Sequence, residues 1–137
     1  MLTAPTVQAQ YMYMDSNGDG VHTAADVITA TGTTVAKVFL RTNKNRDGSD
    51  AICADNQPFT FSSYEFCLRA VGGTVAFSNA TNLQAGMGIT FGKFGSDQEY
   101  YLGYAGAGNP PGDYLLAQIS ISVVSGSPSI EIVDGVS

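Results

Sequence analysis

The chain contains no tryptophan, a single histidine and few charged residues. Charged side chains make up 13% of its 137 residues, about half of the usual share of roughly 25%. The chain has six basic and twelve acidic residues, and its formal net charge is −6. Without a basic stripe the chain cannot neutralise a row of phosphates, which argues against nucleic acid as a partner. The same acidity argues against binding to an anionic membrane surface.

Several functional motifs are also missing. No apolar run approaches the ~18 residues of a membrane-spanning helix, so we expect no membrane insertion. The first residues, MLTAPTVQAQ, lack the basic and apolar regions of a signal peptide. There is no G-x-S-x-G turn and no glycine-rich phosphate loop, and His22 stands alone. We therefore predict a protein that is not an enzyme and has no catalytic residues. Its uncharged polar composition is typical of a mature fragment of an exported protein, located outside the cell or at the cell surface.

Apolar residues recur mainly with a period of two, which indicates β-strands. The pair Gly72-Gly73 predicts a hairpin turn, the SGSPS stretch at 125–129 another turn, and TAADVITATG at 23–32 a short helical turn. We expect one all-β domain over residues 1–137, a β-sandwich or jelly roll of about eight to nine strands. The expected strands are 6–14, 34–42, 59–71 with a bulge at 62–63, 74–80, 86–94, 98–106, 114–124 and 130–133.

The two cysteines, Cys53 and Cys67, form an even set in a chain of extracellular composition. This favours one disulfide. It would close a loop of about 15 residues and stabilise the fold by roughly 3 kcal/mol in the chain-entropy model. The alternative is a pair of buried free thiols.

The stretch DSNGDGVHTAAD, from Asp15 to Asp26, has the oxygen spacing of an EF-hand calcium loop. Ligands are expected at positions 1, 3, 5, 7, 9 and 12, with glycine at position 6, where the backbone must turn sharply. Position 7 contributes only a backbone carbonyl, so a valine there is acceptable. The sequence predicts a Ca²⁺ site with the ligands Asp15, Asn17, Asp19, Val21, Thr23 and Asp26. His22 lies at an outward-pointing position and is expected to be a solvated bystander.

This loop resembles the calcium loop of dockerin modules, in which Asp commonly fills position 12. The resemblance covers residues 15–26, whereas a dockerin contains two loop–helix units, and here the next apolar run is a strand. The end of the chain, DYLLAQISISVVSGSPSIEIV, is similar to cohesin-like and carbohydrate-binding-like jelly-roll modules of secreted microbial proteins. That resemblance implies a binding, adhesive or spacer unit of a larger surface protein.

A second stretch, NKNRDGSDAICAD, repeats the first half of this spacing. Asn43, Asn45 and Asp47 match positions 1, 3 and 5, and Gly48 matches position 6, but position 12 is Ala54. One interpretation is a partial second metal site formed by Asn43, Asn45 and Asp47. The other is an ordinary turn rich in Asn and Asp.

These observations favour a calcium-stabilised extracellular structural or adhesive module, as a unit of a surface array or of an extracellular fibre. The main alternative is a module that binds carbohydrate or a protein partner through tyrosines; the same tyrosines are the more usual filling of a core. A degenerate half-dockerin is a third hypothesis. The N-terminal strand could pair with a neighbouring subunit, or be the first strand of its own sheet. The tyrosines concerned are Tyr100, Tyr101, Tyr104 and Tyr114.

Overall fold

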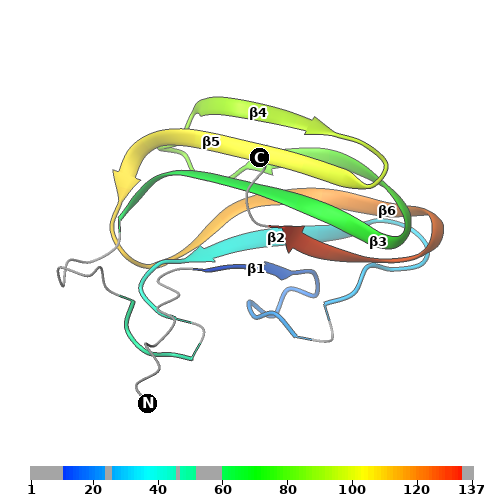
Figure 1. The fold of residues 1–137 in the computed structure, drawn as a ribbon, viewed down its shortest axis with the longest axis horizontal. Helices are drawn as coiled ribbons and strands as arrows, with labels where there is room; N and C mark the ends of the chain where they lie inside the picture. Colours follow the sequence, from blue (N-terminus) through cyan, green and yellow to red (C-terminus); the bar gives the residue numbers. More distant parts are fainter. Residues whose placement is uncertain (1–10, 24–25, 46, 52–59, 134–137) are drawn as a thin grey trace, which may run out of the picture.

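The structure, a computed structural model, describes residues 11–23, 26–45, 47–51 and 60–133. These residues form six strands and no helix, which confirms the predicted all-β class (Figure 1). The strands are β1 (Tyr11–Asp15), β2 (Thr34–Arg41), β3 (Phe61–Asn82), β4 (Ile89–Gly95), β5 (Glu99–Asn109) and β6 (Asp113–Val133). They lie in one antiparallel sheet with the order β1-β2-β6-β3-β5-β4.

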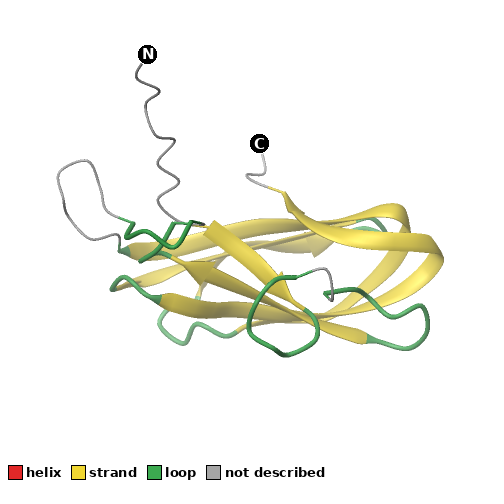
Figure 2. Cartoon of the chain, turned by 90° about the horizontal axis from the view of Figure 1, so that it is seen from below, coloured by secondary structure: helices red, strands yellow, loops and turns green. Residues whose placement is uncertain are grey.

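Two long strands, β3 and β6, run side by side and connect the two ends of this sheet. Residues 67–71 of β3 pair with 129–133 of β6, and residues 73–82 pair with 117–126. The first part of β3 also pairs with β5, and the first part of β6 pairs with β2. Figure 2 shows this two-stranded ribbon curving at one end of the molecule. The ribbon therefore joins β1 and β2, at one edge of the sheet, to β5 and β4, at the other edge. These two parts of the sheet are called its two arms below.

Contacts between distant parts of the ribbon show that the sheet folds over on itself. The Tyr64 hydroxyl donates to Asn82 Oδ1 at 2.7 Å, although both residues belong to β3. In a straight strand, residues this far apart would be separated by about 60 Å. Phe77 of β3 likewise contacts Tyr100 of β5, with ring centroids 5.6 Å apart. The two arms thus face each other across a core, an arrangement consistent with the predicted β-sandwich.

Buried and more exposed side chains alternate along the strands, and the buried ones form the core between the two arms. In β2, every second side chain is buried, because successive side chains of a strand point to opposite faces. β6 contributes Leu116 to this core, and β5 contributes Leu102. The core cluster consists of Met14, Ala36, Val38, Leu40, Phe61, Tyr64, Phe66, Leu68, Ala70, Val75, Ala80, Met87, Leu102, Leu116, Ala117, Ile119 and Ile121.

The strand count differs from the prediction for a physical reason. Residues 59–71 and 74–80 were expected as two strands joined by a hairpin, but Gly72-Gly73 bends one continuous strand, β3. The 125–129 stretch likewise lies within β6 and does not end it. The predicted bulge near 62–63 is confirmed by a register shift between Phe61 and Ser63. Residues 6–10 of the first expected strand lie outside the described residues.

The predicted helical turn at 23–32 is wrong for the part of that segment which the structure describes. Thr23 and Asp26 instead close a tight turn, in which Asp26 N donates to the Thr23 carbonyl at 3.0 Å. The Asp26 carboxylate also accepts the Thr23 N–H at 2.6 Å, but no helix follows over residues 26–33. The next residues, Val27, Ile28 and Thr29, are β-branched, and β-branched side chains disfavour helix. Residues 24–25 lie outside the described residues.

We predict that Tyr64→Phe lowers the free energy of unfolding by about 1–2 kcal/mol, because it removes a hydroxyl whose single proton is shared between two acceptors. The lost bonds are those to Asn82 Oδ1 at 2.7 Å and to the Leu116 carbonyl at 3.2 Å. Urea denaturation measures the effect. Tyr104→Phe is the matched control, since among the described residues its hydroxyl has no side-chain hydrogen bond, and its effect should stay within about 0.5 kcal/mol. Equal losses in the two variants would contradict this account of the fold.

Candidate metal centre

The candidate site lies where β1 ends and the connection to β2 begins. Asp15 is the last residue of β1 and is 2% exposed. Its position is set by pairing with Lys37 of β2 and by the burial of the preceding Met14 in the core. The first predicted ligand is therefore anchored to the sheet.

The chain wraps tightly around the Asp15 carboxylate. Oδ1 accepts the backbone N–H groups of Asn17 at 3.1 Å and Gly18 at 2.7 Å. Oδ2 accepts the N–H of Gly20 at 2.8 Å. Gly20 has a φ of +80°, a conformation that costs glycine little and other residues more. The glycine predicted at position 6 is thus where the backbone turns towards the carboxylate.

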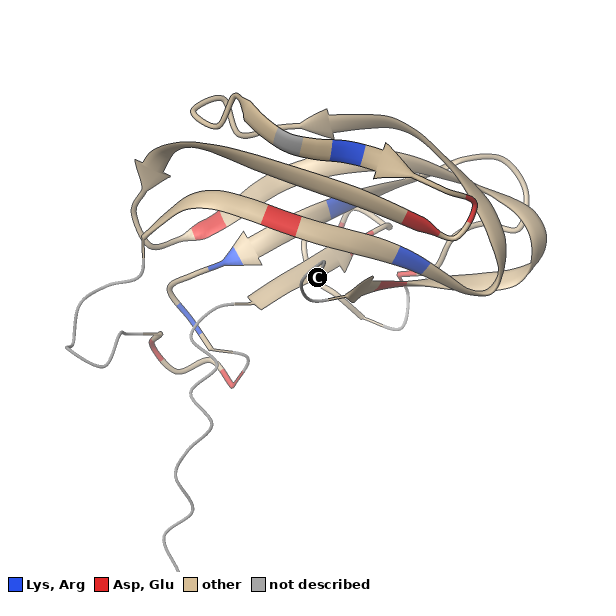
Figure 3. Ribbon diagram, turned by 45° about the horizontal axis from the view of Figure 1, so that its top comes forward, with Lys and Arg blue, Asp and Glu red and all other residues tan. Residues whose placement is uncertain are grey.

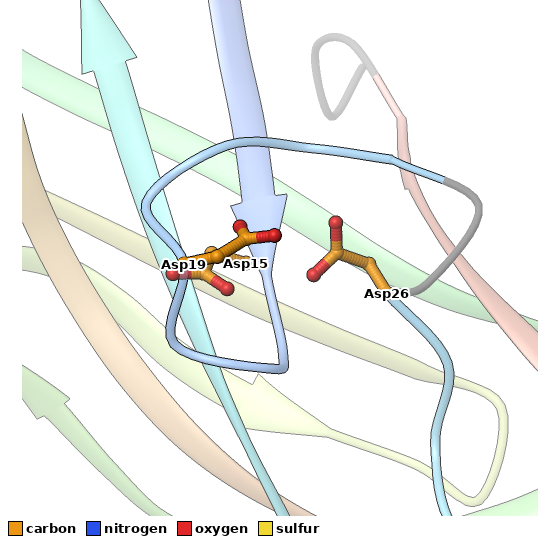
Figure 4. A group of neighbouring side chains, drawn as sticks. All are labelled: Asp15, Asp19 and Asp26. Carbon is orange, nitrogen blue, oxygen red and sulfur yellow. The ribbon is translucent and has the colours of Figure 1, made fainter.

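Asp26 approaches Asp15 from the far end of the same loop (Figure 4). Its side chain is 0% exposed. Oδ1 accepts the N–H of Ser16 at 2.8 Å, and Oδ2 accepts that of Thr23 at 2.6 Å. Burial by itself raises the pKa of the Asp26 carboxyl, but these two hydrogen bonds and the nearby His22 outweigh it, so the pKa lies below its ordinary value. Asp26 is therefore held as a carboxylate.

Asp19 completes the group from the exposed side of the loop. One of its oxygens accepts the Val21 N–H at 3.0 Å, and the other accepts a hydrogen bond from Asn17 Nδ2 at 3.2 Å. Asp15, Asp19 and Asp26 each offer a carboxylate oxygen, and these oxygens lie within 4.8 Å of one another (Figure 4). The structure thus brings together the three acidic residues among the six predicted ligands. The Asn17 side-chain amide donates a hydrogen bond to Asp19. The backbone N–H of Val21 donates to Asp19, and that of Thr23 donates to Asp26.

Three carboxylates this close repel one another. Two unit charges 4.8 Å apart interact by about 3 kcal/mol at an effective dielectric constant of ~20. Among the described residues, the only basic side chain within ion-pair distance is His22, whose Nδ1 lies 3.5 Å from Asp26 Oδ2. A hard divalent cation such as Ca²⁺, which prefers oxygen ligands, would turn this repulsion into attraction.

His22 has a contact that the sequence analysis missed. Its ring lies half exposed, yet Nδ1 is 2.8 Å from the Met14 carbonyl oxygen. Because a carbonyl can only accept, Nδ1 carries the proton in this contact. His22 therefore fastens the loop to the end of β1 and is more than a solvated bystander.

A cavity of ≈ 240 Å³ lies beside the loop. Its arginine and tyrosine groups form hydrogen bonds: Arg41 Nη2 donates to Asp113 Oδ2 at 2.6 Å, and Arg41 Nη1 donates to the Tyr11 hydroxyl at 3.2 Å. The Tyr13 hydroxyl also donates to Asp113, at 3.0 Å, and burial followed by this bond raises the pKa of Tyr13 to about 12. The cavity is lined by Tyr11, Tyr13, Gly20, Val21, His22 and Arg41.

The other predicted site residues are not part of this centre. Asn43, Asn45 and Asp47 lie in the loop that follows β2. Cys67 lies within β3 with a free, buried thiol, and burial raises its pKa. Cys53 lies outside the described residues. The structure therefore does not contain the predicted Cys53–Cys67 disulfide.

The four tyrosines proposed as a binding surface contact other aromatic rings. Tyr100 packs against Phe77, and Tyr104 against Tyr64. Tyr114 packs against Phe61, with ring centroids 4.9 Å apart. Tyr101 is 9% exposed, stacks on Phe94 and donates to Glu65 at 2.8 Å. These contacts agree with the predicted role in packing.

Charged residues of the described strands are scattered (Figure 3), and four of them form two ion pairs, Arg41 with Asp113 and Arg69 with Glu99. Arg69 Nε lies 2.8 Å from Glu99 Oε1, and Lys44 Nζ lies 2.5 Å from Asp50 Oδ1. Within the described part of the chain, no helix is long and apolar enough to cross a membrane. Comparisons of the chain with protein-family models, with curated proteins and with solved structures found no match.

Proposed function

We propose that the chain is a non-enzymatic, calcium-stabilised structural or adhesive module of an extracellular protein. Its role would be that of a unit in a surface array or in an extracellular fibre. The observation that carries the proposal is the gathering of Asp15, Asp19 and Asp26 oxygens within 4.8 Å of one another. The carboxylates come from both ends of one loop, so a cation between them would tie that loop closed.

The length of the connection supports a stabilising role for the cation. Residues 16–33 link β1 to β2 without a strand or helix in the described part. Connections longer than about 12–15 residues without secondary structure are uncommon and usually functional. Ordering such a segment costs conformational entropy. Binding energy from Ca²⁺ would offset that cost, and extracellular calcium modules work with dissociation constants of roughly 10⁻⁴–10⁻³ M.

The surroundings of the site favour rigidity over signalling. Asp15 belongs to a strand whose neighbour Met14 is buried in the core. The adjoining Arg41, Tyr13 and Asp113 are joined by hydrogen bonds. A sensor site needs an element with two arrangements that the cation can shift. The centre described here instead connects a loop to a packed sheet.

The alternative function, binding of a carbohydrate or a protein partner, gains no specific support from the tyrosines, because their rings pack against other aromatic side chains. Self-association through the N-terminal strand stays a prediction. Residues 11–15 pair with β2 of their own chain, which agrees with a first strand of its own sheet, and residues 1–10 lie outside the described part.

Calcium titration calorimetry tests the proposed centre. The wild-type chain is expected to bind Ca²⁺, and Asp26→Asn should weaken this binding by at least tenfold, on the order of 1.4 kcal/mol, because it removes a buried ligand charge. Asp97→Asn, which makes the same charge change at an exposed residue between β4 and β5, is the control and should bind as the wild type does.

Two results would contradict the proposal. Equal calcium affinity of Asp26→Asn and the wild type would place the cation elsewhere. A rise in the fluorescence of an apolar-surface dye on adding Ca²⁺ would indicate a conformational switch, because sensor proteins expose a hydrophobic groove when they bind the ion. A structural site predicts unchanged or lower dye fluorescence.

A further inference from the structure

The loop that follows β2 is closed by its own backbone. Lys44 and Asp50 form an isolated antiparallel bridge, and Ala51 N donates to the Asn43 carbonyl at 3.1 Å. Within it, Asn45 N donates to the Ser49 carbonyl at 2.8 Å. The loop lies at the opposite end of β2 from the Asp15–Asp26 loop (Figure 1). The two loops are therefore separate features of the molecule.

Two side-chain oxygens in this closed loop lack any partner. Asn43 Oδ1 and Asn45 Oδ1 each expose less than 1 Å² and have no hydrogen bond. Among the described residues they are the only buried side-chain nitrogen or oxygen atoms in this condition. Buried acceptors in folded proteins are nearly always satisfied, and an exception commonly marks an ion or water that completes the site. Both unpartnered atoms are hydrogen-bond acceptors, so the missing partner is a cation or a hydrogen-bond donor.

The unpartnered atoms stand at two successive ligand positions. Counting along the chain, Asn43 and Asn45 correspond to Asp15 and Asn17 of the first loop. In the first loop the corresponding oxygens accept backbone N–H groups, at 2.7–3.1 Å for Asp15 Oδ1 and at 3.0 Å for Asn17 Oδ1. In the second loop they accept none.

Positions 5 and 6, which complete the first half of the spacing, are also present. Asp47 Oδ1 accepts the Ser49 N–H at 2.9 Å, as Asp19 Oδ1 accepts that of Val21 at 3.0 Å. Gly48 follows Asp47 with a φ of +88°, close to the +80° of Gly20. Asp50, in contrast, forms an ion pair with Lys44, whose Nζ lies 2.5 Å from Asp50 Oδ1.

We infer that Asn43, Asn45 and Asp47 bind a second hard cation, with Ca²⁺ as the ion of this class that best suits neutral and anionic oxygen ligands. Two carboxamide oxygens and one carboxylate carry a total charge of −1, whereas the first centre gathers three carboxylates. Affinity for Ca²⁺ rises with ligand charge. The second site should therefore be the weaker of the two, filled at the millimolar calcium levels of an extracellular medium. This inference does not depend on the first centre.

Nuclear magnetic resonance with Ca²⁺ as the probe tests the site directly. We expect the side-chain amide signals of Asn43 and Asn45 to shift as Ca²⁺ rises to about 10 mM, both in the wild type and in Asp19→Asn, which removes a ligand of the first centre only. Asp47→Asn should weaken this response at least tenfold. The matched control is Asp50→Asn, a charge change in the same loop at a carboxylate paired with Lys44, and it should leave the response within about twofold of the wild type.

The outcomes separate this inference from the proposed function. Amide shifts of Asn43 and Asn45 that persist in Asp19→Asn support the second site whether or not the first one binds. Absence of these shifts at 10 mM Ca²⁺ would overturn the inference and leave a water molecule as the partner of the two oxygens. Equal weakening by Asp47→Asn and Asp50→Asn would also overturn it, since the effect would then reflect the charge of the loop and not a ligand.

Discussion

Calcium is expected to raise the melting temperature of this protein by about 10 °C relative to EGTA. A cation that binds only the folded state stabilises it by ~2.7 kcal/mol when its concentration is a hundred times the dissociation constant. For a chain of 137 residues, each kcal/mol shifts the melting temperature by roughly 4 °C. Relief of the repulsion among Asp15, Asp19 and Asp26, whose oxygens lie within 4.8 Å, is the physical source of this gain.

The choice of variant decides how clearly this effect can be interpreted. Asp15 accepts three backbone N–H groups, so its removal would destabilise the loop even without calcium. Asp19 is exposed, and an asparagine there can still accept the Val21 N–H. We expect Asp19→Asn to melt close to the wild type in EGTA, or slightly higher because one repulsive charge is gone. In calcium it should lack most of the wild-type gain.

Differential scanning calorimetry of wild type, Asp19→Asn and the control Asp97→Asn, each in calcium and in EGTA, measures these shifts. Asp97→Asn should retain the full calcium gain, because it changes the net charge equally but at an exposed position outside the loop. An unchanged wild-type melting temperature in the two media would show that DSNGDGVHTAAD is only a turn. Loss of the gain in both variants would mean that calcium acts through the net charge of the protein.

Replacing Gly126 by alanine is expected to destabilise the fold by about 3 kcal/mol, the largest effect that we predict for a single methyl group. Gly126 has a φ of +74° and pairs with Gly73 where the β3–β6 ribbon bends. A Cβ atom there would lie 2.6 Å from the Gly72 carbonyl oxygen and 2.9 Å from Gly73 Cα. Both neighbours are backbone atoms, so relief of the overlap requires the ribbon itself to move.

The loss should be global because the bend is what brings the two arms of the sheet together. Gly73→Ala should act similarly, since a Cβ there meets the Ser125 carbonyl and lies 2.9 Å from Pro128 Cδ. Gly108→Ala, near the end of β5, is the control: no atom lies within 4 Å of its Cβ position, and its φ is not positive. Urea denaturation should show a loss of stability in the first two variants and almost none in the third. Equal stability of all three would contradict the account of the bend.

Local sequence signals correctly predicted the features that depend on neighbouring residues. The alternation of buried and exposed side chains in β2 follows from its sequence, and so does the break between Asn109 and Asp113. The gathering of Asp15, Asp19 and Asp26 could also be predicted, because all three lie within one twelve-residue spacing. Such features arise from backbone geometry over a few residues and need little information about the rest of the chain.

Contacts between residues that are distant in the sequence could not be predicted from local sequence signals. Gly72-Gly73 has the signature of a hairpin turn, yet the pair bends a continuous strand because Gly126 lies opposite and β6 stays paired along the bend. The bond from Tyr64 to Asn82 exists only because that bend folds β3 over. Positive φ is a local property, but whether it ends a strand or curves it depends on which segment pairs with it.

The same division holds for the two candidate cation sites. By itself, the sequence determined the class of the fold and the spacing of the oxygen ligands, since periodicity and ligand position are properties of short segments. Only the tertiary structure decided that Asp15 is anchored to a core strand, and that Asn43 Oδ1 and Asn45 Oδ1 are buried without partners. Burial depends on what the rest of the chain places around an atom, and no local pattern specifies those surroundings.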